Sequence, residues 1–262
     1  MGIVCIILPG SEQRAFVNAL HEATGQGVDL VVIKKPKIRT ARDRLRRIYE
    51  VVRAPHLLRE LWYGALLRLS RRTRMALKYF RATSFGAIPV DYAPKTMEVE
   101  DVNSGEVVRL LEEMSPELIV IWCSAILRPP LLATTKRVIN FHTGILPYYR
   151  GSVANQFAVL RRDTTHIGST IHYVSPGVDR GDIIAQLYGD TSKSPREMFE
   201  ELNDASLRTF IQIAKRVLAG EDVPGQKQNQ HEGGFFRLSQ WSNYLRWTVG
   251  RQLLRWERTG QF

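Results

Sequence analysis

Short apolar runs that do not alternate with polar residues recur along the chain, separated by helical patterns. Ile3–Leu8 and Val28–Ile33 are two such runs, and the segment between them carries apolar residues at helical spacing. The same order returns with a run at Ile88–Val90, a helix over about Ser104–Met114 and a run at Leu118–Trp122. Uninterrupted apolar strands are typical of a parallel sheet buried on both faces. The pattern therefore predicts an α/β domain with a doubly wound, mostly parallel sheet and a functional site at the carboxyl ends of its strands.

The second half of the chain continues this pattern and then departs from it. Val138–Phe141 is a further apolar run, Gly168–Val174 and Asp182–Leu187 have the composition of strands, and Pro195–Leu218 predicts a long amphipathic helix opened by Ser194. After Gly220 the chain becomes polar and then basic and aromatic. We expect one catalytic domain over residues 1–220, with an insert at about 36–84, followed by an extension over residues 221–262.

The positive charge of the chain belongs to this insert. The 262 residues carry a net charge of +11, but 16 Lys and Arg against three acids lie between Lys34 and Arg81, so that segment alone carries +13. Both cysteines lie in apolar runs, and no disulfide framework or zinc cluster is readable. No apolar stretch approaches the length of a membrane span. The expected location is the cytoplasm, either free or peripheral to a membrane.

Residues 38–81 show apolar positions at helical spacing among arginines, broken at Pro55. Two basic amphipathic helices fit this pattern. They could be a helical cap with its arginines in solvent, or an interfacial pair on an anionic membrane with Trp62, Leu66 and Leu69 facing the acyl chains. The basic, aromatic extension could pack on the insert, form a homodimer contact or reach the same surface. Nucleic-acid binding is not favoured, because no recognisable nucleic-acid module is present.

The chemistry is concentrated after two of the predicted strands. Asn140 and His142 lie two residues apart at the end of an apolar run, so both point to one face. The following residues reach Gly151 through a tight loop with Gly144 and Pro147. A second polar loop, 176–182, places Asp179 between two glycines, which allows a close backbone approach to a ligand.

Asn140, His142 and Asp179 supply an amide, an imidazole and a carboxylate, and no Ser or Cys nucleophile is evident beside them. These groups suit the transfer of an acyl group to an amine. Asn140 can donate to the oxyanion, His142 can donate or relay a proton, and Asp179 can hold the imidazole charged and accept the amine proton. Each residue alone could be a strand cap or a turn acid, but their combination favours catalysis. The remaining histidines, including His172, are expected to be structural or exposed, and Asp182 to stabilise its loop.

These elements resemble the formyltransferases that use 10-formyltetrahydrofolate, a family that includes glycinamide ribonucleotide, methionyl-tRNA and sugar-nucleotide formyltransferases. The resemblance rests on Asn140-x-His142, the Leu146-Pro147-x-x-x-Gly151 loop and the segment Gly177–Ile184, in that order. It implies that Asn140, His142 and Asp179 are catalytic and that the enzyme needs no metal. It also implies a folate site formed by Ser124, Ala125, Ile126, Leu127, Leu146, Pro147, Gly151, Gly177 and Val178.

Departures from the family patterns narrow the acceptor. The loop after the first apolar run, Leu8-Pro9-Gly10-Ser11-Glu12, has one glycine and an acid, which does not favour the phosphate site of the glycinamide ribonucleotide enzymes. Only 42 residues follow position 220, fewer than the barrel domain of the methionyl-tRNA enzymes needs. The remaining expectation is a small-molecule amine, a nucleotide-linked amino sugar. The alternatives are 10-formyltetrahydrofolate hydrolysis, glycinamide ribonucleotide formylation and, in another class, a membrane-docked binding protein without formyl transfer.

Overall fold

The computed structural model describes most of the 262 residues of the chain. The described residues are 2–36, 40–42, 45, 49, 56–84, 91–122, 125–229 and 231–262. The predicted run Ile88–Val90, most of the first predicted insert helix and both Cys123 and Ser124 lie outside them. None of the helices among these residues combines the length and the apolar character that a membrane-spanning helix needs.

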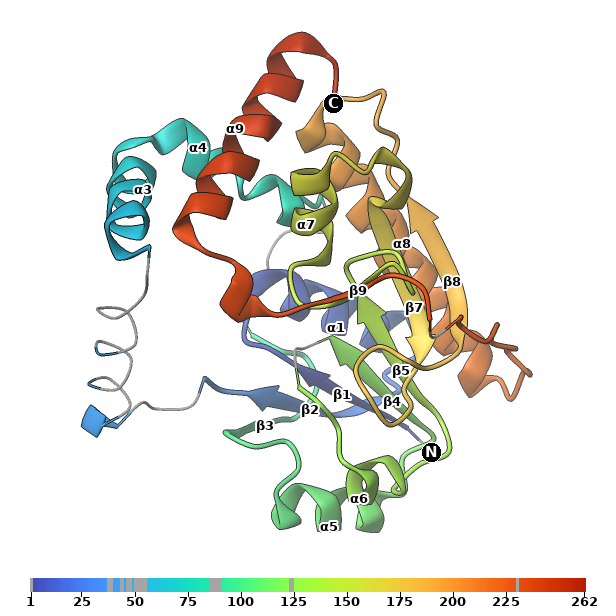
Figure 1. Cartoon of the computed structure of the whole chain (residues 1–262). Coiled ribbons are helices and arrows are strands. Elements are labelled where there is room, and N and C mark those ends of the chain that lie inside the picture. Colours follow the sequence, from blue (N-terminus) through green and yellow to red (C-terminus); the bar gives the residue numbers. More distant parts are fainter. Residues whose placement is uncertain are drawn as a thin grey trace.

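A seven-stranded sheet forms the centre of the molecule (Figure 1). Its strand order is β3-β2-β1-β4-β5-β7-β8; the first five strands are parallel, and β7 pairs antiparallel with both β5 and β8. The strands are β1 (Ile3–Ile7), β2 (Val28–Lys34), β3 (Thr96–Val99), β4 (Leu118–Trp122), β5 (Val138–His142), β7 (Gly168–Tyr173) and β8 (Ile183–Tyr188). The prediction of a mostly parallel α/β fold is confirmed.

Helices cover both faces of this sheet, which explains the uninterrupted apolar runs. Alternate residues of β1 face opposite layers: Ile3 and Ile7 pack with α1 and α8, and Val4 and Ile6 pack with α5 and α6. The bounds of these helices are α1 (Ser11–Ala23), α5 (Gly105–Met114), α6 (Pro129–Leu132) and α8 (Pro195–Leu218). The α8 helix has the predicted bounds, and the Ser194 side chain caps it by accepting from the Glu197 N–H.

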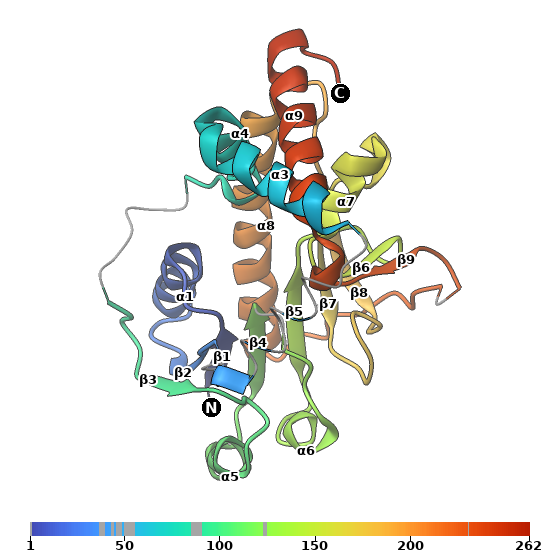
Figure 2. The same cartoon turned by 60° about the vertical axis from the view of Figure 1, so that its left-hand side comes forward.

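The insert and the C-terminal extension pack against each other, one of the three arrangements that the sequence left open. Figure 2 shows α9 standing beside α3 and α4, above the carboxyl edge of the parallel strands. The α9 helix buries Val249, Leu253 and Trp256 in a second apolar core that Ala76 and Phe80 of the insert also join. The helices on this side of the molecule are α3 (Leu57–Leu69), α4 (Arg71–Ala76), η1 (Tyr79–Arg81), α7 (Ala154–Arg161), η2 (Thr164–His166), η3 (Leu238–Gln240) and α9 (Asn243–Thr259).

A short second sheet links the extension to the loop after β5. Its strands β6 (Tyr149–Gly151) and β9 (Gly234–Phe236) are parallel. Two flanking hydrogen bonds hold them, from the Gly234 N–H to the Tyr148 carbonyl and from the Ser152 N–H to the Phe236 carbonyl, each at 2.8 Å. The extension is therefore part of the wall around the carboxyl edge of the main sheet.

Candidate active site

A cavity of about 510 Å³ opens at the carboxyl edge of the parallel strands. It lies where the first β-α loop, the ends of β4 and β5 and the loop after β7 meet, and residues of the insert and the extension close its other side. An open α/β sheet binds ligands at this edge because its strand ends and loops converge there. The cavity therefore lies where the sequence predicts the site.

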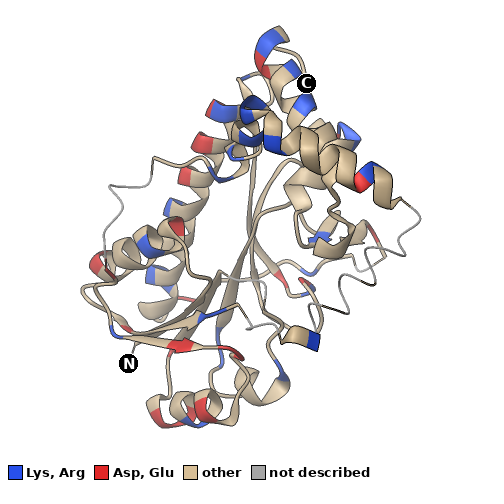
Figure 3. Ribbon diagram, turned by 90° about the vertical axis from the view of Figure 1, so that its left-hand side faces the viewer, with Lys and Arg blue, Asp and Glu red and all other residues tan. Residues whose placement is uncertain are grey.

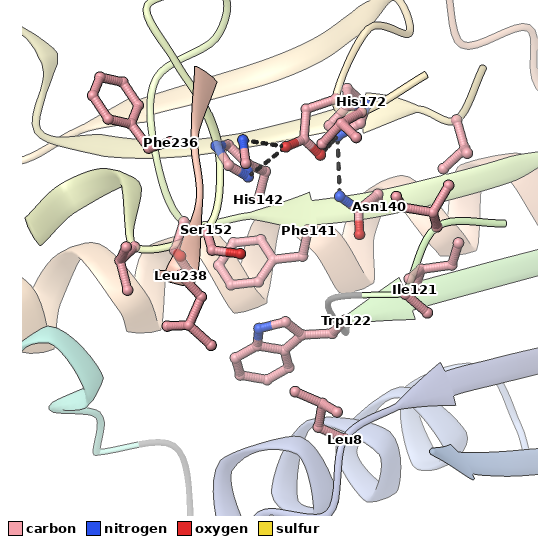
Figure 4. Close-up of a pocket in the computed structure, with 18 of the residues that line it drawn as sticks. Leu8, Ile121, Trp122, Asn140, Phe141, His142, Ser152, His172, Phe236 and Leu238 are labelled. Carbon is pink, nitrogen blue, oxygen red and sulfur yellow. Dashed lines mark hydrogen bonds and ion pairs between the residues drawn. The ribbon is translucent and has the colours of Figure 1, made fainter. Parts of the chain in front are cut away.

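Asn140, His142 and Asp179 all line this cavity, and Figure 4 shows Asn140 and His142 on its wall beside His172. The β5 strand presents Asn140 and His142, which are 9% and 6% exposed. Asp179 arrives on the loop after β7 and places its Oδ2 3.6 Å from His142 Nδ1. The three side chains that the sequence singled out are thus brought together, although two come from the strand β5 and one from the loop after β7.

His142 is fixed by acceptors at both ring nitrogens. Its Nε2–H donates to the Tyr149 carbonyl at 2.7 Å, and its Nδ1 faces the Asp179 carboxylate. A neutral imidazole with its proton at Nε2 leaves Nδ1 ready to take a proton, and a protonated ring satisfies both acceptors. His142 can therefore hold a proton at Nδ1 without turning.

Asp179 is held as a carboxylate. Burial alone would raise the pKa of Asp179, but the nearby His142 and His172 rings and the Gly151 N–H hold it well below its ordinary value. The Gly151 N–H donates to Oδ2 at 2.8 Å. Gly151 has a φ of +91°, and a Cβ there would collide with the Phe236 carbonyl, so the donor position requires glycine.

The structure adds His172 to this group, a residue that the sequence analysis assigned to a structural or exposed role. It is 2% exposed on β7, lies directly across from Asn140 in the β5–β7 register, and approaches it with Nε2 3.0 Å from Asn140 Nδ2. Its Nδ1–H donates to the Tyr173 carbonyl at 2.7 Å, so in the neutral ring Nε2 is the acceptor of the Asn140 amide. His172 Nε2 also lies 3.6 Å from Asp179 Oδ1.

The amide of Asn140 is left with polar atoms to offer a ligand. One of its Nδ2 hydrogens goes to His172, and no described residue accepts the other. Its Oδ1 is buried and finds no hydrogen-bond partner among the residues that the structure describes. A buried polar atom without a partner is rare in a native protein. The Asn140 Oδ1 atom and the second Nδ2 hydrogen therefore match a ligand that brings both a hydrogen-bond donor and a carbonyl oxygen.

The residues expected to hold folate fall into three groups. The cavity is lined by Ala125, Ile126, Leu127, Gly151, Gly177 and Val178, whereas Ser124 lies outside the described residues. Leu146 and Pro147 are not among the residues that line the cavity, so their place at the folate site stays a prediction. Both are buried, and the Leu146 N–H and carbonyl are already taken by Thr170 and Gln186. Their loop, with a cis peptide at Pro147, supports the wall of the site from behind.

The insert and the extension add residues that sequence reasoning did not assign to the site. The lining residues are Phe80, Arg81 and Thr83 from the insert and Phe235, Phe236, Arg237 and Leu238 from the extension. Gln228 of the extension also donates to the carbonyls of Asp179 and Gly181, which braces the Asp179 loop. The only signal of these contacts in the sequence is the aromatic and basic composition of the two segments, which does not specify a location.

The family model for formyl transferases matches residues 3–211, which is most of the chain. A methionyl-tRNA formyltransferase of Syntrophomonas wolfei subsp. wolfei is 25% identical over 166 residues, which cover 62% of this chain and 52% of that protein. Another, from Limosilactobacillus fermentum, is 29% identical over 148 residues, covering 55% and 46%. The chain thus spans about half the length of the curated relatives it matches.

Solved structures of two further kinds share the fold. A sugar N-formyltransferase from Shewanella has a TM-score of 0.57 at 16% identity, covering 95% of this chain and 88% of that chain. A phosphoribosylglycinamide formyltransferase from Bacillus halodurans has a TM-score of 0.52 at 19% identity, covering 83% and 95%. The family match confirms the resemblance that the motifs indicated. The chain belongs to the formyl transferase family.

Proposed function

We propose that this member of the formyl transferase family is an N-formyltransferase, which moves a formyl group from 10-formyltetrahydrofolate to a primary amine of a small molecule. The observation that carries the proposal is that Asn140, His142 and Asp179 line one cavity, with Asn140 Oδ1 unpaired among the described residues. No metal is needed for the roles proposed for these residues.

The side chains match the needs of formyl transfer. The donor supplies an activated formyl group, and the acceptor nitrogen gives up one proton, which ends on the donor nitrogen, as it gains the formyl carbon. The open N–H of Asn140 stabilises negative charge on the formyl oxygen, and its Oδ1 orients the incoming amine. His142 Nδ1, beside the Asp179 carboxylate, holds and returns the proton in transit.

The cavity offers folate an apolar wall with polar backbone at its edge. Trp122 and Leu127 provide apolar surface, and the loop at Gly177 and Val178 provides backbone groups. Such a site, mostly apolar with a few placed polar groups, is typical of cofactor pockets. We assign the folate to this side of the cavity, from Ala125 to Leu127 and along the Asp179 loop.

The wall formed by the insert and the extension favours an anionic, ring-bearing acceptor. Phe235 offers an aromatic face and Arg237 a guanidinium group at the cavity, whereas the positive charge of Arg81 acts on the Glu12 carboxylate. Arginine recognises phosphate by paired hydrogen bonds, and an aromatic ring stacks on a base or sugar. These features support a nucleotide-linked amino sugar as the acceptor.

The start of α1 disfavours glycinamide ribonucleotide. A helix N-terminus binds phosphate through its open N–H groups. Here the first turn carries Glu12, which lines the cavity together with Gly10 and Gln13. A carboxylate at that position repels a phosphate.

An acceptor panel tests both levels of the proposal. The purified protein is incubated with 10-formyltetrahydrofolate and nucleotide-linked amino sugars, glycinamide ribonucleotide or methionyl-tRNA, and tetrahydrofolate release is measured. We expect turnover with at least one amino sugar and none with H142A. Turnover of glycinamide ribonucleotide alone would contradict the proposed acceptor. Tetrahydrofolate release without any amine would assign hydrolysis instead.

A further inference from the structure

The α3 helix presents an apolar face that no other described element covers. Its exposed members are Leu58, Leu61, Trp62, Ala65 and Leu69, here called the α3 stripe. The four large side chains are 83%, 59%, 64% and 83% exposed, in that order. At 3.6 residues per turn these positions fall within about 100° of the helix circumference, so they form one continuous strip.

The opposite face of α3 already holds the helix to the protein. Leu67 is buried, Tyr63 packs against the Tyr244 ring at 5.0 Å, and the Glu60 carboxylate accepts the Asn243 N–H at 2.7 Å. These contacts anchor α3 on α9 and turn the α3 stripe outward. Leu66, which the sequence also placed toward a lipid surface, is half-buried at the edge of the strip. The α3 stripe is therefore not part of the face that packs α3 against the rest of the protein.

Positive charge surrounds the α3 stripe. Residues 56–84 contain seven Lys and Arg and one acid, Glu60, which is engaged with α9. Arg59 and Arg68 flank the strip on its two sides, and Arg71 and Arg72 follow its end; all four are exposed. Figure 3 shows Lys and Arg gathered on the helices of this end of the molecule.

We propose that the α3 stripe and its flanking arginines dock the protein on an anionic lipid bilayer. An interfacial helix lies in the plane of the membrane with Leu and Trp in the headgroup boundary and Arg side chains reaching to the phosphates. A second copy of the chain is disfavoured, because it would present the same positive charge. Nucleic acid is disfavoured because the strip is mainly leucine, whereas single strands are held by stacking on aromatic rings.

The position of α3 connects this surface with the cavity. Figure 2 shows α3 above the carboxyl edge of the sheet, and the same segment continues through α4 to Phe80, Arg81 and Thr83 at the cavity wall. The α3 stripe and part of the cavity wall therefore belong to one continuous described segment, residues 57–83. The proposal does not depend on the identity of the acceptor.

Vesicle co-sedimentation of the full chain tests the proposal. Vesicles of phosphatidylcholine with phosphatidylglycerol are compared with vesicles of phosphatidylcholine alone. We expect binding to the anionic vesicles that weakens as salt is raised. The double variant L61S/W62S should lower the partition constant at least about tenfold, and each of R68Q and R71Q about fivefold.

Matched controls separate docking from general damage. Y188S removes an exposed aromatic residue on β8, and R109Q removes an exposed arginine on α5; neither should change binding. All variants should keep their thermal unfolding and their formyl-transfer rate with a soluble acceptor, since none alters the cavity. Loss of transfer by the wild type would bear on the proposed function and not on docking.

Three results would overturn the proposal. The first is no binding to anionic vesicles, or binding that L61S/W62S leaves unchanged. The second is equal binding to both kinds of vesicle. The third is that L61S/W62S abolishes binding of a single-stranded oligonucleotide or self-association of the chain, while vesicle binding stays as in the wild type.

Discussion

Replacing Asp179 by Asn changes one charge at the centre of the site and little else. The amide keeps the shape of the carboxylate. Its oxygen can still accept the Gly151 N–H, which in the wild type donates to Asp179 Oδ2 at 2.8 Å. The negative charge 3.6 Å from His142 Nδ1 and 3.6 Å from His172 Nε2 is lost. We expect D179N to fold and to lose most of its formyl transfer.

The distance sets the size of this loss. Two unit charges 3.6 Å apart interact by about 4.6 kcal/mol at an effective dielectric constant of about 20. If His142 is protonated only in the transition state, removal of its partner costs roughly 10³-fold in kcat/KM. This falls within the range of about 10²- to 10⁴-fold that positioned acids and bases contribute.

The assay compares kcat/KM of the wild type, D179N and D182N at saturating donor. Asp182 lies in the same loop but does not line the cavity, so D182N is a matched control and should stay within about threefold of the wild type. If folded D179N stays within about tenfold of the wild type, Asp179 does not support a protonated His142 and the reasoning is refuted.

The same variant tests the lowered pKa of Asp179. A carboxyl whose pKa is lower in the folded than in the unfolded state stabilises the fold above its unfolded value, about 3.9, and this contribution disappears as the pH falls through the folded value. At pH near 7 the free energy of unfolding should therefore be smaller for D179N than for the wild type. The gap should narrow on acidification, and a gap that widens would contradict the cause assigned to the pKa.

Three further changes test other parts of the account. H172F should lower kcat about 10²-fold with little change in the donor KM, because it removes the acceptor that orients the Asn140 amide; an unchanged kcat would contradict that role. G151A should lower the free energy of unfolding by about 1–3 kcal/mol, whereas G25A, at positive φ but in open space, should cost less in the same denaturant titration. R237Q should raise the KM for a nucleotide-linked acceptor about tenfold and leave the donor KM unchanged. A change in the donor KM alone would mean that Arg237 contacts the folate and not the acceptor.

The buried strands and the shared face of Asn140 and His142 were predictable because both are encoded locally. Continuous apolar runs such as Leu118–Trp122 report burial on both faces, and the two-residue spacing of Asn140 and His142 places both side chains on one face. Among the described strands of the main sheet, β3 is the one that the pattern missed, and it lies at the edge of that sheet. Its residues, Thr96–Val99, alternate between exposed and half-buried positions and so form no apolar run.

The rest of the site depends on contacts between distant segments. His172 joins Asn140 only because β5 and β7 pair in one register, which no local pattern specifies. Phe235–Leu238 reach the cavity through the short β6–β9 pairing. Leu146 and Pro147 follow the family motif in sequence, but tertiary hydrogen bonds to Thr170 and Gln186 hold Leu146 behind the wall.

Transfer of an isotopically labelled formyl group tests the central claim most directly. The wild type and H142A are incubated with labelled 10-formyltetrahydrofolate and a nucleotide-linked amino sugar, and the sugar is analysed by mass spectrometry. The account predicts one labelled formyl group on the amine nitrogen with the wild type and none above background with H142A. Label released only as formate, or equal labelling by both proteins, would contradict it.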